Sequence, residues 1–234
     1  MNFWKISASM ICADHGNIER DTKILDSSSV EWLHIDVMDG SFVPRFGMYP
    51  EQVSTIRNFT NKKIDAHMMV DNPEPYICAF ADAGLSLMSV HIENNYHINR
   101  TIRLISQAGM EAGIILNTST PIEAVRWLLD DPNLKLIMLL GINPGILGQG
   151  IWEPIYKKAS NLKTYLQKAG RGDILIQIDG SVKKDNSAKL IQSGFDVLVC
   201  GSSTIFRSQD GALKDNIDNY RNSVKSALRG YDAV

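Results

Sequence analysis

The sequence predicts a closed (β/α)8 barrel, an α/β fold of the TIM-barrel type, on three observations. Short runs rich in β-branched and other apolar residues alternate with amphipathic helical patterns, which indicates a parallel sheet. Eight such runs occur in 234 residues, which is the strand number and approximate length of such a barrel. The first run is followed by "CADHGN" instead of the G-x-G-x-x-G turn expected of the structural alternative, a doubly wound open sheet.

The predicted strands are short, mostly apolar segments, several of which follow a glycine that would end the preceding helix. In chain order they cover 5–11, 31–38, 63–70, 85–92, 111–117, 134–142, 174–180 and 196–201. Helical patterns lie between them, among others at 74–84, 98–109, 121–131 and 187–194. No linker or low-complexity tract divides the chain, so we expect one domain over residues 1–234 with a loose tail at 229–234.

Composition excludes several kinds of partner. The formal net charge is −2 and no stretch approaches 18 consecutive apolar residues, so we expect neither a nucleic-acid nor a membrane partner. The three cysteines, Cys12, Cys78 and Cys200, contain no C-x-x-C pair and are too few for a disulfide framework. We therefore expect a cytoplasmic protein in which any anionic ligand is held by a local site.

The segment "HIDVMDG" at 34–40 places ionisable residues in an otherwise apolar strand. In a barrel, the carboxyl-terminal ends of the strands face the active-site mouth, where polar side chains are tolerated. Side chains alternate along a strand, so His34, Asp36 and Met38 share one face. Asp39 lies off that face, and we expect it to shape the following loop or cap a neighbour.

A candidate metal site combines this strand with two others. His34, Asp36, His67 and Asp179 fall at the same end of three predicted strands. Two imidazoles and two carboxylates suit one divalent transition ion such as zinc, manganese, iron or cobalt. The alternative for each residue alone is a hydrogen-bonded core or strand-end side chain, but the joint placement favours the metal site.

Glycine-containing loops follow the last three predicted strands, at 143–150, 179–181 and 201–203. Glycine lets backbone N–H groups approach an anion, and the loops after strands 7 and 8 often bind phosphate in these barrels. Any one loop alone would be read as an ordinary turn. Three adjacent loops predict a phosphate site, although no Walker-type motif is present.

Taken together, these stretches resemble the ribulose-phosphate 3-epimerase family. The resemblance rests on "SASMICADHGNI", "HIDVMDGSFVP", "IDAHMMV", "SVHIE", "GIILNTSTP", "NPGILGQ", "IQIDGSV" and "VCGSSTIF", in this order from residue 7 to 206. It implies a ribulose-phosphate-binding (β/α)8 barrel, a homo-oligomer, that inverts C3 of a ketose phosphate such as D-ribulose 5-phosphate. "HIDVMDG" and "IDGS" look particularly like the branch acting on D-allulose 6-phosphate.

The resemblance also implies roles for individual residues. His34, Asp36, His67 and Asp179 match the metal ligands, and Asp36 and Asp179 match the two acid/base residues. The positions that match substrate contacts are Ser9, Met38, His67, Met69, Gly145, Ile146, Leu147, Gly148, Asp179, Gly180, Ser181, Gly201 and Ser202. For the two methionines, plain core filling is an almost equally good explanation.

The expected chemistry explains the pair of carboxylates. The C3 proton is acidic because it lies next to the C2 ketone, and its removal gives an enediolate whose charge a metal ion can stabilise. Inversion requires that the proton return from the opposite face. Two carboxylates, Asp36 and Asp179, on opposite faces of C3 meet this need, because one removes a proton while the other supplies one.

The chain departs from the family pattern at several positions near the predicted mouth. These are Ala8, Ser41, Arg45, Leu140, Leu147 and Ser181. None is a predicted metal ligand, so they bear on the substrate more than on the reaction type. Arg45 either reaches an anionic group of the substrate or is a surface charge.

Two rival functions remain at this point. One is a phosphate-binding barrel with other chemistry; a decarboxylase of this type would carry D-x-K-x-x-D, but Met38 occupies the lysine position. A Schiff-base aldolase would need a lysine at a strand end, and none of the predicted strands ends in one. The other rival is a sugar-phosphate binder without activity, which would have no need to keep both aspartates.

Overall fold

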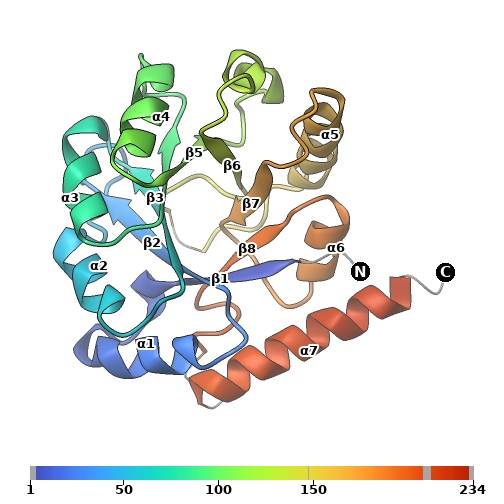
Figure 1. Cartoon of the computed structure of the whole chain (residues 1–234). Helices are drawn as coiled ribbons and strands as arrows, with labels where there is room; N and C mark the ends of the chain where they lie inside the picture. Colours follow the sequence, from blue (N-terminus) through green and yellow to red (C-terminus); the bar gives the residue numbers. More distant parts are fainter. Residues whose placement is uncertain (1–3, 147, 208–211, 232–234) are drawn as a thin grey trace.

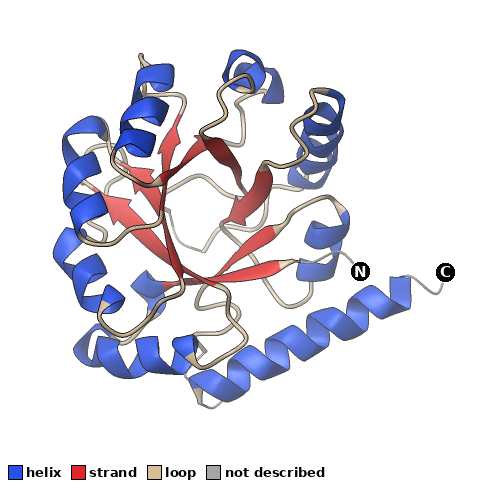
Figure 2. Cartoon of the chain, in the orientation of Figure 1, coloured by secondary structure: helices blue, strands red, loops and turns tan. Residues whose placement is uncertain are grey.

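Eight parallel strands form a closed barrel with helices around its outside (Figures 1 and 2). The computed structural model describes residues 4–146, 148–207 and 212–231, and within them the strands pair in chain order, β8 closing against β1. The strands are β1 Lys5–Ser9, β2 Trp32–Met38, β3 Lys63–Met69, β4 Leu87–His91, β5 Glu111–Leu116, β6 Leu134–Leu140, β7 Leu175–Asp179 and β8 Val197–Cys200. Every strand lies inside its predicted range, and the predicted barrel is confirmed.

The helices occupy the connections between strands. The α-helices are α1 Ile18–Asp26, α2 Pro50–Arg57, α3 Ile77–Asp82, α4 Ile98–Gln107, α5 Ile155–Lys168, α6 Ser187–Gln192 and α7 Leu213–Tyr231. Short 3-10 helices are Met10–Cys12, His15–Asn17, Glu74–Tyr76 and Ile122–Leu128. None of the helices within the described ranges has the length and apolar character needed to cross a bilayer.

Two predicted segments differ from the structure. The helical pattern at 121–131 forms a 3-10 helix, in which Val125 and Leu128, three residues apart, are the buried positions. The predicted loose tail is wrong for residues 229–231, which belong to α7. That helix is held to the barrel because Ile217, Tyr220 and Val224 are buried at helical spacing.

Strand pairing brings the polar residues of β1, β2 and β3 together. Ser9 lies opposite His34, and His34 in turn lies opposite Asp65. Two residues further along, Asp36 lies opposite His67. Because side chains alternate across a strand, these residues all point into the barrel, while Ile35 and Ala66 between them belong to the apolar layer around it.

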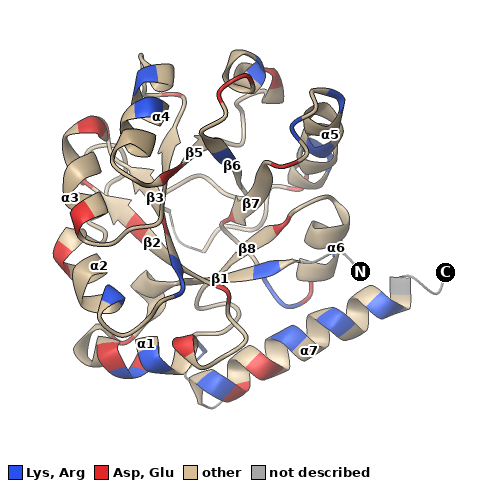
Figure 3. Ribbon diagram, in the orientation of Figure 1, with Lys and Arg blue, Asp and Glu red and all other residues tan. Residues whose placement is uncertain are grey.

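Basic and acidic residues are interspersed along the outer helices (Figure 3). A second apolar cluster faces the barrel interior and reaches from the amino-terminal ends of the strands up to Leu140, which lies opposite Asp179 at the mouth. Its members are Trp32, Leu87, Ile115, Leu136, Met138, Leu140 and Val197. The polar cluster lies beside these residues, on β1, β2, β3 and β7.

Candidate active site

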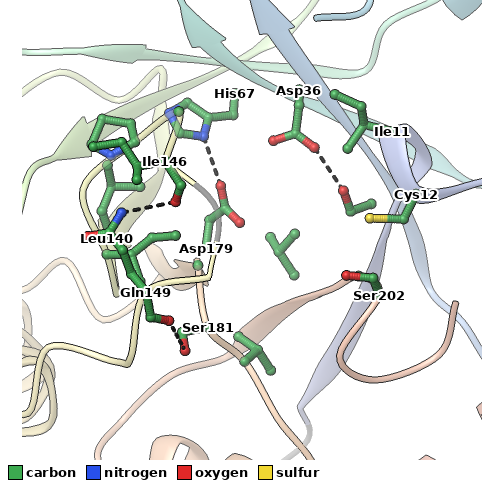
Figure 4. A pocket seen from close by; sticks show the side chains of 18 of the residues that line it. Ile11, Cys12, Asp36, His67, Leu140, Ile146, Gln149, Asp179, Ser181 and Ser202 are labelled. Atoms are coloured by element: carbon green, nitrogen blue, oxygen red, sulfur yellow. Dashed lines mark hydrogen bonds and ion pairs between the residues drawn. The ribbon is translucent and has the colours of Figure 1, made fainter. Parts of the chain in front are cut away.

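A cavity of about 350 Å³ opens at the carboxyl-terminal ends of the strands. Asp36 from β2, His67 from β3 and Asp179 from β7 form its polar floor (Figure 4). With one exception, every predicted substrate-contacting residue lines it: Ser9, Met38, His67, Met69, Gly145, Ile146, Gly148, Asp179, Gly180, Ser181, Gly201 and Ser202. The exception, Leu147, lies outside the described residues.

The four predicted metal ligands converge beneath this cavity. One potential ligand atom from each of His34, Asp36, His67 and Asp179 can be chosen so that all lie within 4.8 Å of one another. His34 Nε2 is 3.8 Å from Asp36 Oδ1 and 4.0 Å from Asp179 Oδ2. His67 Nδ1 lies 2.9 Å from the same Asp179 oxygen. Strands far apart in the sequence thus supply one compact group of two nitrogens and two carboxylates.

His34 is oriented by a residue below the cavity. Its Nδ1 lies 2.6 Å from Asp65 Oδ2, and both side chains are fully buried. Asp65 also accepts hydrogen bonds from Ser7 Oγ and Gln177 Nε2, at 2.5 and 2.9 Å. In the neutral ring, with Nδ1 as the donor to Asp65, Nε2 has the lone pair that a metal ligand needs. No described atom hydrogen-bonds with this buried Nε2, which is the condition expected of a ligand aimed at a cation.

Asp65 is the functional residue whose role sequence reasoning missed. In the sequence Asp65 is an ionisable residue within the third predicted strand, and no motif assigns it a role. The signal was its position two residues before His67, on the same inward face. Recognising it would have required the pairing register, which places it beside His34.

The cluster carries an excess of negative charge. Burial lowers the pKa of His34, but the carboxylates of Asp65, Asp36 and Asp179 outweigh it and raise that pKa to about 10. Burial raises the pKa of Asp36, while hydrogen bonding from His67 and the charge of His34 lower that of Asp179 against its burial. The group therefore favours a positive charge at its centre, which fits a divalent cation.

Asp36 and Asp179 differ in their surroundings, although both reach the cavity. Asp36 accepts a hydrogen bond from Ser9 Oγ at 2.8 Å, so the serine of β1 fixes the carboxylate of β2. Asp179 is oriented by His67 instead, as the dashed line in Figure 4 shows. Asp39 is turned away and accepts backbone N–H groups of Ser41 and Asp71, at 2.8 and 2.9 Å, which confirms that it shapes the loop.

The predicted phosphate loops surround the other side of the cavity. Gly145, Gly148 and Gly180 have φ values of 74°, 78° and 95°, in the left-handed region that glycine adopts most readily. Ser181 occupies the same region at φ 57°, and its hydroxyl donates to the carbonyl of Gln149 at 3.2 Å. This contact joins the loops after β6 and β7 (Figure 4).

The loop after β8 comes close to β1. A Cβ placed on Gly201 would lie 3.2 Å from Cys12 Sγ, a tighter contact than Cβ atoms usually make, so a larger residue there would have to displace the cysteine side chain. Met38 and Met69 are buried together with Val43 at the cavity wall. The structure thus places both methionines where they can contact a ligand as well as fill the core.

Two cationic side chains also line the cavity. Arg45, which follows β2, is half-buried, and Lys183, which follows β7, is exposed. The position of Arg45 favours the interpretation in which it reaches an anionic group of a ligand. An anion entering the cavity passes both charges.

Comparisons with known proteins agree with the family resemblance. Residues 5–206 match a family model described as "Ribulose-phosphate 3 epimerase family". Relatives named ribulose-phosphate 3-epimerase occur in Bacillus subtilis, 36% identical over 87% of this chain and 93% of that protein, and in Synechocystis, 34% identical over 94% of each. A relative from Aquifex aeolicus with the same name is 37% identical over 88% of this chain and 90% of that protein.

Solved structures with little sequence identity share the fold. A structure described as KGPDC from Streptococcus mutans has a TM-score of 0.72 at 13% identity, and covers 96% of this chain and 98% of that one. A tryptophan synthase α-subunit variant from Pyrococcus furiosus has a TM-score of 0.66 at 12% identity, covering 98% of both chains. These likenesses confirm the barrel and carry no information on the reaction.

Proposed function

The chain belongs to the ribulose-phosphate 3-epimerase family and is therefore a carbohydrate isomerase, and on this premise we propose that it inverts C3 of a ketose phosphate with the help of one divalent metal ion. The proposed substrates are D-ribulose 5-phosphate and D-xylulose 5-phosphate, or a related pentulose or hexulose phosphate such as D-allulose 6-phosphate. The observation that carries the proposal is the convergence of Asp36 and Asp179 on one cavity floor beside His34 and His67.

The two carboxylates are the proposed acid and base. The C2 ketone makes the C3 proton acidic, and removing it leaves a planar enediolate. A carboxylate on each face of that plane lets one residue take the proton and the other return one with inversion. Asp36 on β2 and Asp179 on β7 approach the cavity from different strands, as this geometry requires.

His34, Asp36, His67 and Asp179 are the proposed holders of the ion, which is zinc, manganese, iron or cobalt. The buried Nε2 of His34 without a described partner and the carboxylate-rich cluster both fit a cation. A bound divalent ion would supply positive charge next to the ketone and C3 oxygens, where negative charge develops. Asp65 and Ser9 support this group by fixing the orientation of His34 and Asp36.

The phosphate is proposed to lie against the loops after β6, β7 and β8. Gly145 and Gly180 allow their backbone N–H groups to turn toward an anion, and the hydroxyl of Ser202 faces the same cavity (Figure 4). Lys183 adds a positive charge at the edge of these loops. The reacting end of the sugar then extends toward Asp36 and Asp179.

The rival chemistries are less well supported. Met38 occupies the place where the decarboxylase pattern needs a lysine, and it lies in the cavity wall beside Met69. Among the described residues, no lysine within a strand lines the cavity, so the lysine that a Schiff-base aldolase needs at a strand end is not found there. A binder without activity would not need the two carboxylates in one group with two histidines.

The experiment is a substrate panel. The purified protein is stripped of metal, reloaded in turn with Zn²⁺, Mn²⁺, Fe²⁺ or Co²⁺, and assayed on D-ribulose 5-phosphate, D-xylulose 5-phosphate and D-allulose 6-phosphate. We expect interconversion of C3 epimers with at least one of these sugars, lost on stripping and restored on reloading. Equal activity before and after stripping would overturn the metal dependence, and inactivity on all three with every metal would overturn the proposed function.

A further inference from the structure

Beyond the four proposed ligands, a third histidine, His91, and a glutamate, Glu93, extend the site away from the cavity. We propose that Glu93, acting through His91, holds His67 in the tautomer whose Nδ1 lone pair faces Asp179 and the proposed metal. Both are positioning residues, since neither lines the cavity. The inference rests on the proposed metal site, and its test separates the two.

The three side chains form one continuous hydrogen-bonded chain. His67 Nε2 lies 2.8 Å from His91 Nε2, and His91 Nδ1 lies 3.0 Å from Glu93 Oε2. His67 and His91 are each only 1% exposed, and their ring centroids are 5.0 Å apart. Burial leaves no bulk water to compete for these hydrogen bonds, so each must have a defined donor and acceptor.

Glu93 is fixed as the acceptor at the end of this chain. Its other oxygen, Oε1, accepts the backbone N–H of Asn117 at 2.7 Å and the hydroxyl of Thr120. Burial alone would raise the pKa of Glu93, but hydrogen bonds from His91, Thr120 and Asn117 lower it to about 2. The group is therefore an ionised carboxylate, which can only accept hydrogen bonds.

The protonation sites of His91 and His67 follow from the acceptor role of Glu93. Since Glu93 only accepts, His91 carries its proton on Nδ1, and its Nε2 in the neutral ring is an acceptor. His67 must then donate from Nε2, because a hydrogen bond between two ring nitrogens needs one donor. In the neutral ring this leaves the lone pair of His67 Nδ1, which lies 2.9 Å from Asp179 Oδ2, available to the proposed cation once that ion takes the place of the hydrogen bond to Asp179.

The sharpest variant is Glu93→Gln. The backbone N–H of Asn117 cannot become an acceptor, so it retains the amide oxygen and turns the amide NH2 toward His91. His91 then has to accept on Nδ1 and carry its proton on Nε2. His67 in turn accepts on Nε2 and carries its proton on Nδ1, where the metal would bind. One substitution of nearly equal shape thus reverses the direction of donation in every hydrogen bond from residue 93 through His91 to His67.

Two matched variants act as controls. Glu93→Asp keeps an acceptor carboxylate and should keep the wild-type tautomer of His67. Thr120→Val removes one hydrogen bond to Glu93 and leaves the Asn117 contact and the carboxylate in place. We expect the Thr120→Val protein to bind metal within about threefold of wild type, whereas the loss of a second-shell partner usually lowers metal affinity 10- to 100-fold.

The test measures tautomers and metal affinity without any substrate. Imidazole nitrogen shifts from ¹⁵N NMR of the zinc-loaded protein, assigned with a His67→Gln variant, should show His67 protonated on Nε2 and bound through Nδ1 in wild type, and Glu93→Gln should lose this pattern. Zn²⁺ titration against a coloured chelator should give a 10- to 100-fold weaker affinity for Glu93→Gln.

Three results would overturn the inference: Nδ1-protonated His67 in the wild type, an unchanged tautomer in Glu93→Gln, or an unchanged zinc affinity in that variant. If Glu93→Gln does not fold, the wild-type spectrum still tests the inference, because it shows which nitrogen of His67 carries the proton. A wild-type protein that shows the expected tautomer but has no epimerase activity refutes the proposed function alone.

Discussion

His34 Nδ1 lies 2.6 Å from Asp65 Oδ2 inside the barrel, where neither side chain is exposed. This pair connects the barrel interior to the active-site mouth, because the donor role of Nδ1 determines what Nε2 can do. Strand pairing makes the contact: His34 and Asp65 are direct neighbours on β2 and β3. The carboxylate of Asp65 therefore determines which nitrogen of His34 is available to the proposed metal.

Replacing Asp65 by Asn should weaken metal binding. The amide has only one acceptor oxygen for the three donors Ser7, His34 and Gln177, so one buried donor loses its partner. We expect a 10- to 100-fold lower Zn²⁺ affinity and a loss of about 3 kcal/mol in the free energy of unfolding. Chelator competition and urea unfolding measure the two effects. Glu111→Gln, at a half-exposed carboxylate paired with Lys63, is the control and should change neither by much.

Adding one methyl group at Gly47 should disrupt the strand that carries Asp36. A Cβ on Gly47 would lie 2.3 Å from the carbonyl oxygen of Asp36 and 2.5 Å from the backbone nitrogen of Met38. Backbone cannot move aside cheaply, so Gly47→Ala should cost about 2 kcal/mol or more of stability and lower kcat. Gly172→Ala, where the Cβ meets open space, is the matched control. Equal urea midpoints for the two variants would refute the close contact.

The low pKa of Glu93 predicts a pH-dependent contribution to stability. Its pKa is lowered to about 2 from an ordinary 4.5, so the folded state binds fewer protons at this group than the unfolded state does. The stabilisation is complete above pH 4.5 and is lost as the pH falls toward 2. A shift of this size corresponds to about 3 kcal/mol, which we reduce to about 2 for partial exposure.

Urea unfolding of wild type and Glu93→Gln between pH 7 and 3 measures this contribution. The difference between the two free energies of unfolding should be largest at pH 7 and should shrink below pH 4.5. Ile137→Val, a core change without a titrating group, should cost about 1 kcal/mol at every pH. A Glu93→Gln difference that stays constant with pH would contradict the low pKa.

Arg45 should contribute to capture of the anionic substrate. It lines the cavity from the loop after β2, where its charge adds to that of Lys183 across the mouth. We expect Arg45→Met to raise KM about 3- to 10-fold at low salt with little change in kcat, and the effect should fade at high salt. Steady-state kinetics at two ionic strengths measures this. Arg20→Met, at an exposed arginine paired with Asp14 and Asp21 outside the cavity, should leave KM unchanged.

The barrel could be predicted because each strand has a local pattern of apolar residues in the sequence. The apolar runs of buried parallel strands predict all eight ranges, helped at several of them by a preceding glycine, and the inward face of "HIDVMDG" follows from simple alternation. The tail at 229–231 was mispredicted because α7 depends on Ile217, Tyr220 and Val224 packing against a barrel far earlier in the sequence. Such long-range burial leaves only a weak local signal.

The convergence of the four proposed ligands could be predicted from the sequence, but the residues that support them could not. His34, Asp36, His67 and Asp179 were found because they fall at strand ends, whereas the role of Asp65 depends on the register between two strands. His91 and Glu93 lie at the end of β4, but their hydrogen-bonded contact with His67 crosses from one strand to another and leaves no local pattern in the sequence. The cytoplasmic location and the homo-oligomer remain predictions.

The central claim is that Asp36 and Asp179 transfer protons on opposite faces of C3. The direct measurement follows the metal-loaded protein in D2O with C3-protiated D-ribulose 5-phosphate, stopped at low conversion. Two bases predict that the product carries deuterium at C3 while recovered substrate stays protiated, because the proton taken on one face is not the one returned on the other. Product that retains its original C3 protium would contradict the account.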